Sequence, residues 1–306
     1  MHDTLFEIRI ILKKMDNIMK KSLVLCIVIL LMGGSYLSAQ DNLSNGKALN
    51  FPAKKYGISI GNSYEFTGIR INFADENVKI INGLNITFWL KMFKNKNAVV
   101  NGISVGVIPV AAVLNGISVG VMTFAGTIQP ISLGLLYLGA KNYLNGLSIS
   151  GLIVATDGNI NGLSVSGLVT MAEEDKSVIS GIAISGIVLG ARKAINGLAI
   201  GGLAVLTGGD ISGVASSLAC IACGKNIQGI AVTGGLLHSE MFKGVAIAGY
   251  AKTHQMHGLS IALYNRTKEL HGIQFGLMNY AENNPKGLRM LPFINLHLRK
   301  NQNSDK

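Results

Sequence analysis

The sequence predicts an all-β protein, a repeat β-solenoid with coils of about 14–16 residues. The first observation is a phrase that recurs between Asn101 and Leu291: a polar residue, a glycine, an aliphatic residue, a small residue and a second aliphatic residue. The second is spacing, because Gly181, Gly197 and Gly213 follow one another every 16 residues. A unit that cannot bury its own apolar face must stack on its neighbours, so the repeats indicate a stacked array.

We call the glycine of each repeat its marker. The markers are Gly102, Gly116, Gly146, Gly162, Gly181, Gly197, Gly213, Gly229, Gly244, Gly258, Gly272 and Gly287, with Pro130 in the same place in IQPISLG. Degenerate copies at Gly57, Gly68 and Gly83 extend the array towards the N-terminus. A marker that turns a stacked corner should have a positive φ or leave no room for a Cβ. Gly162 and Gly197 test this expectation, and replacing either by Val is expected to cost more than replacing the adjacent Ser164 or Ala199 by Thr.

Each unit reads as strand, corner, strand and loop. In NGLSISGLIVATDGNI, Leu147 and Ile149 alternate as on one face of a strand, and Leu152 and Val154 restart the alternation one residue out of phase. A period-2 pattern that slips at a glycine indicates a corner or a bulge. Charged residues follow the second strand, as Asp157 does here.

Two architectures accommodate such units. A solenoid relates every coil to the next by translation, so a single unit is its natural repeat, whereas an up-and-down outer-membrane β-barrel repeats as a hairpin. The single-unit period favours the solenoid. In the six residues after each marker from Gly102 to Gly272, Pro130 included, none is charged, which leaves the barrel as the alternative, with one face in lipid. Against the barrel, no Phe, Tyr or Trp occurs between Tyr143 and Phe242 to form an aromatic girdle.

The predicted organisation has four parts. Residues 1–39 read as a signal peptide, with Lys20 and Lys21 before an apolar run from Leu23 to Met32 and a small residue, Ala39, at the cleavage point. The alternative for this run is a short membrane-anchoring helix, although a span takes about 20 apolar residues. Residues 40–100 are an N-terminal β segment with degenerate repeats, residues 101–298 the tandem-repeat β domain, and residues 299–306 a polar tail.

Charge argues against nucleic acid as a partner. Removing residues 1–39 takes five basic and three acidic residues from totals of 27 and 16, which leaves 22 − 13 = +9. The remaining Lys and Arg residues are scattered through loops without interleaved aromatics, which is not typical of nucleic-acid binding. Attraction to an anionic cell envelope is the expectation instead.

Three groups of residues could form chemical sites, but each is better explained as part of the structure. Cys220 and Cys223 form a CxxC pair, but in one strand they would point to opposite faces with Cα atoms about 10 Å apart, too far for a disulfide. His257 and His271 share a repeat position and should stack about 4.8 Å apart, with His254 nearby, yet no further ligand recurs for a metal. The glycine string Gly197–Gly202 suggests a phosphate loop but is followed by no helix. We therefore predict no catalytic, cofactor-binding or metal-binding residue.

The tandem G-aliphatic-x-aliphatic-G-aliphatic units resemble those of bacterial surface-repeat proteins exported by Gram-negative cells. The resemblance also includes FTGIRINFADENVKIINGLNITFW (residues 66–89) and HGIQFGLMNYAENNPKGLRMLPFIN (residues 271–295), and it covers roughly residues 57–298. It implies an outer-membrane or cell-surface location, no known catalytic activity and an unidentified envelope or surface partner, with outer-membrane association as a further expectation. We expect a non-enzymatic structural or adhesive interaction module, with an outer-membrane barrel or pore as the alternative.

Overall fold

The computed structural model describes residues 48–52, 55–90 and 97–297. The predicted signal peptide (residues 1–39) and polar tail (residues 299–306) lie outside these residues. The strands are β1 (Ala48–Pro52), β2 (Tyr56–Gly61), β3 (Glu65–Asp75), β4 (Ile80–Leu90), β5 (Val99–Gly106), β6 (Val110–Ser150), β7 (Ile153–Thr156), β8 (Asn159–Ser166), β9 (Val169–Ala172), β10 (Val178–Ser185), β11 (Val188–Ala191), β12 (Ala194–Gly201), β13 (Ala204–Thr207), β14 (Asp210–Ser217), β15 (Cys220–Cys223), β16 (Asn226–Thr233), β17 (Leu236–Ala281) and β18 (Met290–His297). One 3₁₀ helix, η3 (Lys286–Leu288), precedes β18.

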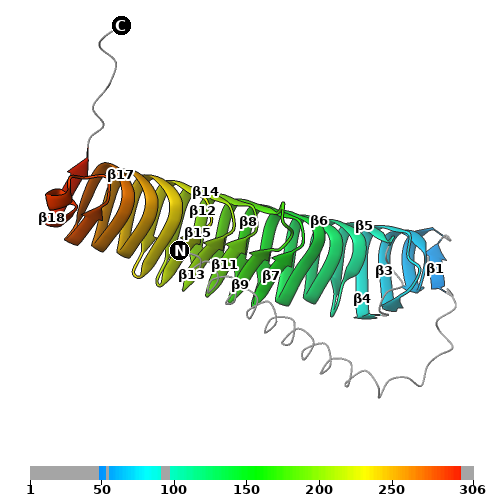
Figure 1. The fold of residues 1–306 in the computed structure, drawn as a ribbon. Coiled ribbons are helices and arrows are strands. Elements are labelled where there is room, and N and C mark those ends of the chain that lie inside the picture. Colours follow the sequence, from blue (N-terminus) through cyan, green and yellow to red (C-terminus); the bar gives the residue numbers. More distant parts are fainter. Residues whose placement is uncertain (1–47, 53–54, 91–96, 298–306) are drawn as a thin grey trace, which may run out of the picture. The chain divides into compact units, whose positions relative to one another are not determined.

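Neighbouring coils pair in parallel, and equivalent residues of the repeat face one another. Gly162 in β8 pairs with Gly181 in β10, which pairs with Gly197 in β12 and then with Gly213 in β14. Translation from coil to coil produces this pairing, whereas an up-and-down arrangement would pair neighbours antiparallel. The predicted β-solenoid is therefore confirmed, and Figure 1 shows its coils stacked along β1–β18.

The coils between β6 and β17 follow the predicted order of strand, corner, strand and loop. An eight-residue strand such as β8 ends at a two-residue break, Gly167–Leu168, and the four-residue β9 follows. In β6 and β17 the extended backbone continues through the corners, so each of these strands winds over several coils (Figure 1).

The markers form one column along the solenoid. Gly162 has φ +111° and Gly197 has φ +114°, and a Cβ on either would collide with the carbonyl oxygen of the marker one coil earlier. The same contact repeats from Gly68, against Gly57, to Gly272, so the degenerate N-terminal copies belong to the column. The column has fifteen positions: Gly57, Gly68, Gly83, Gly102, Gly116, Pro130, Gly146, Gly162, Gly181, Gly197, Gly213, Gly229, Gly244, Gly258 and Gly272.

Gly287 was wrongly predicted as a marker. It lies in η3, and no atom comes within 4 Å of the place where its Cβ would be. Pro285 explains the difference, because proline has no N–H with which to continue a ladder and its φ of −52° does not fit a strand. The chain turns there and returns as β18, antiparallel to the last coil.

The core lies inside the coils and is built from two apolar columns. The residue two before each marker points inward, and Ile160, Ile179 and Ile195 in this column are all 2% exposed or less. The four-residue strands contribute the second column, in which Val205 and Ile221 are fully buried. No helix in the described ranges is long and apolar enough to cross a membrane.

Both ends of the stack are covered by an antiparallel strand. β1 pairs antiparallel with β2 at the N-terminal end, and β18 pairs antiparallel with β17 at the C-terminal end. Each covering strand contains a proline, Pro52 in β1 and Pro292 in β18. Proline in an edge strand removes a backbone donor and so discourages the addition of another strand.

Candidate functional site

The most prominent surface feature is an uncharged apolar face, which we call the aliphatic face. It consists of the residues one and three positions after each marker, and all but Ser216 and Phe275 are aliphatic. The first column is Ile58, Ile69, Leu84, Ile103, Ile117, Ile131, Leu147, Leu163, Ile182, Leu198, Val214, Ile230, Val245, Leu259 and Ile273. These side chains point out of the solenoid: Ile103 is 41% exposed, Ile182 42% and Ile230 43%.

The alternation of each strand explains why the apolar residues face outward. The residue between the two aliphatic columns points inward, and in the central coils it is small: Ser164, Ala183 and Ala199 are all 0% exposed. A narrow interior has room only for small side chains there, so the larger aliphatic residues must occupy the outer face. Ser164 and Ala199, the positions expected to be less sensitive than the marker, therefore belong to the core.

One flank of the aliphatic face is a ladder of amide side chains. The residue before each marker is often Asn, and Asn115 donates from Nδ2 to Oδ1 of Asn101, at 2.9 Å, which donates in turn to Asn82 at 2.8 Å. Asn161 and Asn145 repeat this bond at 2.9 Å. The amide side chains therefore hydrogen-bond from one coil to the next along the stack, rather than across the aliphatic face.

The other flank is apolar and lies beyond the corner. Leu168, Ile187 and Leu203 follow the corner glycines and are 37%, 38% and 49% exposed. In the central coils charged side chains follow the second strand, as Glu174 and Arg192 do. The prediction that charges collect in the loops is thus confirmed, and the aliphatic face is continuous with a third apolar column.

The two cysteines of the CxxC pair are free thiols in β15. Cys223 is buried and donates from Sγ to the carbonyl oxygen of Gly209 at 2.8 Å. Burial raises the pKa of the Cys223 thiol to about 12 and raises that of Cys220 as well. The interpretation as a buried small residue is confirmed for Cys223, whereas Cys220 is only partly buried.

The stacked histidines lie where the repeat predicts them. The ring centroids of His257 and His271 are 4.8 Å apart and nearly parallel, which matches the spacing of adjacent strands. A third ring, that of His297 in β18, has its centroid 6.0 Å from that of His271. Among the described residues no group of three or more His, Cys, Asp or Glu side chains is arranged to hold a metal ion.

The glycine string Gly197–Gly202 begins in β12 and passes into the corner that follows.

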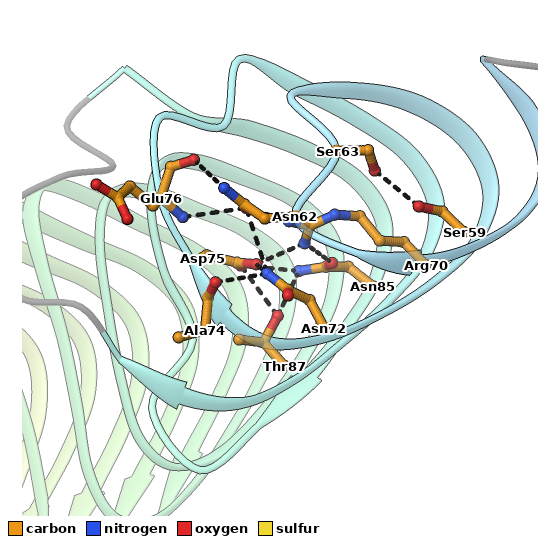
Figure 2. A network of polar contacts seen from close by, with 10 residues as sticks. All are labelled: Ser59, Asn62, Ser63, Arg70, Asn72, Ala74, Asp75, Glu76, Asn85 and Thr87. Carbon is orange, nitrogen blue, oxygen red and sulfur yellow. Dashed lines mark hydrogen bonds and ion pairs between the residues drawn. The ribbon is translucent and has the colours of Figure 1, made fainter. Parts of the chain in front are cut away.

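Sequence reasoning missed a buried charge network in the N-terminal coils (Figure 2). Arg70 of β3 is fully buried at the inward position two residues after Gly68. Its Nη1 donates to Asp75 Oδ1 at 2.5 Å and to Asn85 Oδ1 at 2.7 Å, and its Nη2 donates to Asn62 Oδ1 at 2.9 Å. Thr87 donates to the other oxygen of Asp75 at 3.0 Å. The network compensates the charge of Arg70 and joins β3, β4 and the turn that follows β2.

A second polar network, without a buried ion pair, lies in the C-terminal coils. Asn265 donates to Asn279 at 2.7 Å, and Asn295 of β18 donates to the backbone carbonyl of Asn279 at 3.2 Å. Asn284 donates to Asn295 at 2.7 Å, and its own Oδ1 lies 2.6 Å from Nδ1 of His297. These bonds fasten the terminal strand to the last coils.

A signal in the sequence could have located the N-terminal network. The position two after each marker is Ser or Ala from Ser104 to Ser260, but Arg70 and Asn85 occupy it in the N-terminal coils. Large polar side chains at an inward position require partners inside the protein.

Comparison of the chain with protein-family models, with curated proteins and with solved structures finds no match.

Proposed function

We propose that this chain is a non-enzymatic, exported cell-envelope or surface repeat protein that acts as a structural or adhesive interaction module. The aliphatic face is the observation that carries the proposal. Monomeric soluble proteins rarely expose contiguous apolar patches beyond a few hundred Å², and larger patches mark interaction sites. This face repeats at every coil of the column, with no charged residue in either of its two columns.

The rigidity of the scaffold supports the same function. Each coil pairs with its neighbours in register, and a Cβ on the marker glycines of the central coils would collide with the preceding coil. Such a stack presents its outer side chains at fixed positions, as solenoids do on their extended binding surfaces. Export is supported by the basic residues, apolar run and small residue in residues 1–39.

Location and adhesion are tested on cells of a Gram-negative host that produce the full chain. We expect protease added to intact cells to cleave the protein, and its N-terminus to begin near Gln40. Recovery of the chain in the cytosol with Lys20 still present would contradict export.

The adhesive role is tested with the double variant Leu163→Lys, Ile182→Lys, which places two charges on the aliphatic face. We expect these cells to adhere less to one another in suspension than cells with the unchanged protein. Asp175→Lys is the matched control, because it changes the net charge by the same +2 on an exposed loop residue. Equal loss in the variant and the control would argue against a role for the face.

A further inference from the structure

We infer that the aliphatic face is a self-association surface, and that its partner is a second copy of this chain packed face to face. The inference deepens the proposed function, on which it rests for the role of the face in contacts. Four properties of the face and its surroundings point to this partner: its area, its repeat distance, the chemistry of its flank and the covering of the two ends.

The area is sufficient for a specific dimer. The marker column has fifteen positions, and strands in a stack lie about 4.8 Å apart, so the face is about 67 Å long. Two outward columns lie about 7 Å apart along a strand, which gives a width of about 10 Å with their side chains. Two such faces would bury roughly 1,300 Å² together, within the range of about 1,200–2,000 Å² for stable specific interfaces.

The distance between neighbouring coils favours a second copy of this chain as the partner. Side chains such as Leu163, Ile182 and Leu198 follow one another at the coil spacing and form ridges with grooves between them. A second copy carries ridges at the same spacing, so its side chains can enter the grooves at every coil, as in dry interfaces between sheets. A surface with another repeat distance, or none, would touch only the tips of the ridges.

The flank of the face disfavours a lipid surface as the partner. Membrane-surface elements combine an apolar face with Lys or Arg at its border and with aromatic residues at the headgroup level. In the central coils the residue before the marker is Asn145, Asn161, Ser180, Asn196, Ser212 or Gln228. No Phe, Tyr or Trp occurs between Tyr143 and Phe242. The aliphatic face here offers dispersion contacts without groups that anchor to headgroups.

The covered ends direct association to the side of the solenoid. β1 and β18 close the stack, and Pro52 and Pro292 interrupt the donors of these strands. Addition of chains end to end is therefore discouraged. Lateral contact between two identical faces is isologous and closes as a dimer with two-fold symmetry.

The test uses the full chain purified from the host, with molecular mass measured by light scattering and sedimentation over a range of concentrations. Both two-fold arrangements, parallel and antiparallel, place the middle coil of one copy on the middle coil of the other. Gly162 marks that coil, as the eighth of fifteen positions. Leu163→Lys, Ile182→Lys would bring like charges together there, and we expect its dimer dissociation constant to rise at least 100-fold. Asp175→Lys should leave the dimer unchanged.

A second variant with the opposite charge tests whether misfolding, rather than repulsion across the face, causes the loss of the dimer. The variant Leu163→Glu, Ile182→Glu should also be monomeric alone, and mixing it with the Lys variant should restore a heterodimer. Three results would overturn the inference: an unchanged protein that is monomeric at all concentrations, a dimer that the face variants leave intact, or a monomer that co-sediments with phosphatidylcholine vesicles. A monomer found at the cell surface would leave the proposed function standing, whereas an intracellular dimer would refute export and leave the self-association standing.

Discussion

The carbonyl oxygen of Gly181 occupies the space that a side chain on Gly197 would need. The two glycines are paired in adjacent parallel strands, β10 and β12, and each has a positive φ. The marker is therefore restricted twice, by its own backbone conformation and by the coil before it.

Gly197→Val should destabilise the protein by at least about 1 kcal/mol, the scale of a non-glycine residue forced into a conformation of this kind. The neighbouring Leu198→Val changes an outward side chain and should change the unfolding free energy by no more than about 0.5 kcal/mol. Denaturant unfolding measures both. Because coils contact mainly their neighbours, limited proteolysis should first cut near residue 197 in the glycine variant. Equal stability of the two variants would show that the column does not depend on glycine.

Ala199→Leu should cost about 1–3 kcal/mol, because Ala199 is fully buried between strands that cannot separate without breaking their pairing. The outward Ile200→Leu is the matched control, one residue further along β12. Thermal unfolding compares the two variants, and a lower melting temperature is expected for Ala199→Leu alone. Comparable melting temperatures would mean that the interior has more space than the structure shows.

Arg70→Met should destabilise the N-terminal coils by about 3–5 kcal/mol, since removal of one partner leaves Asp75 charged and poorly compensated in a protein interior. Asp75→Asn in the same chain should recover part of the loss, because the carboxylate is then neutral. A double-mutant cycle on the unfolding free energy gives the coupling between the two residues. Additive effects would contradict an energetic role for the pair.

The thiols of Cys220 and Cys223 should react slowly with iodoacetamide at pH 7.5 in the folded protein and rapidly after denaturation. Burial raises both pKa values, to about 12 for Cys223, so little thiolate exists at neutral pH. Peptide mass spectrometry of the alkylated residues measures the reactivity, and fast native labelling of Cys223 would contradict its burial.

The raised pKa of Cys223 also makes the unfolding free energy depend on pH. An ordinary thiol ionises near pH 9, so the unfolded chain loses this proton at a lower pH than the folded chain does. The folded protein is therefore destabilised as pH rises from about 9 to 12.

The solenoid could be predicted from the sequence because its main structural requirement, a glycine at one position of each coil, is local and repeated. A glycine that must lie against the coil before it recurs wherever a coil recurs, so Gly162 and Gly197 revealed the column without any tertiary information. The inside and outside of each strand were harder to assign. Both Leu198 and Ala199 are apolar, and only the narrow interior decides that the smaller one is buried.

The polar networks depend on contacts that the repeat does not encode. Arg70 finds Asn62 and Asn85 in the coils on either side of its own, and β18 reaches Asn279 only after the chain has reversed direction. Gly287 matched the expected spacing, but spacing alone could not show that Pro285 ends the parallel ladder.

The unequal length of the coils shows where this architecture can accept new chain. The interval from Gly162 to Gly181 is 19 residues and that from Gly181 to Gly197 is 16, yet all three glycines stay paired. The difference lies in the loop before the next coil, five residues (173–177) before β10 and two (192–193) before β12. A segment grafted at the exposed residues 174–176, such as an epitope or an affinity tag, would therefore be displayed at a fixed height on the stack without altering the column.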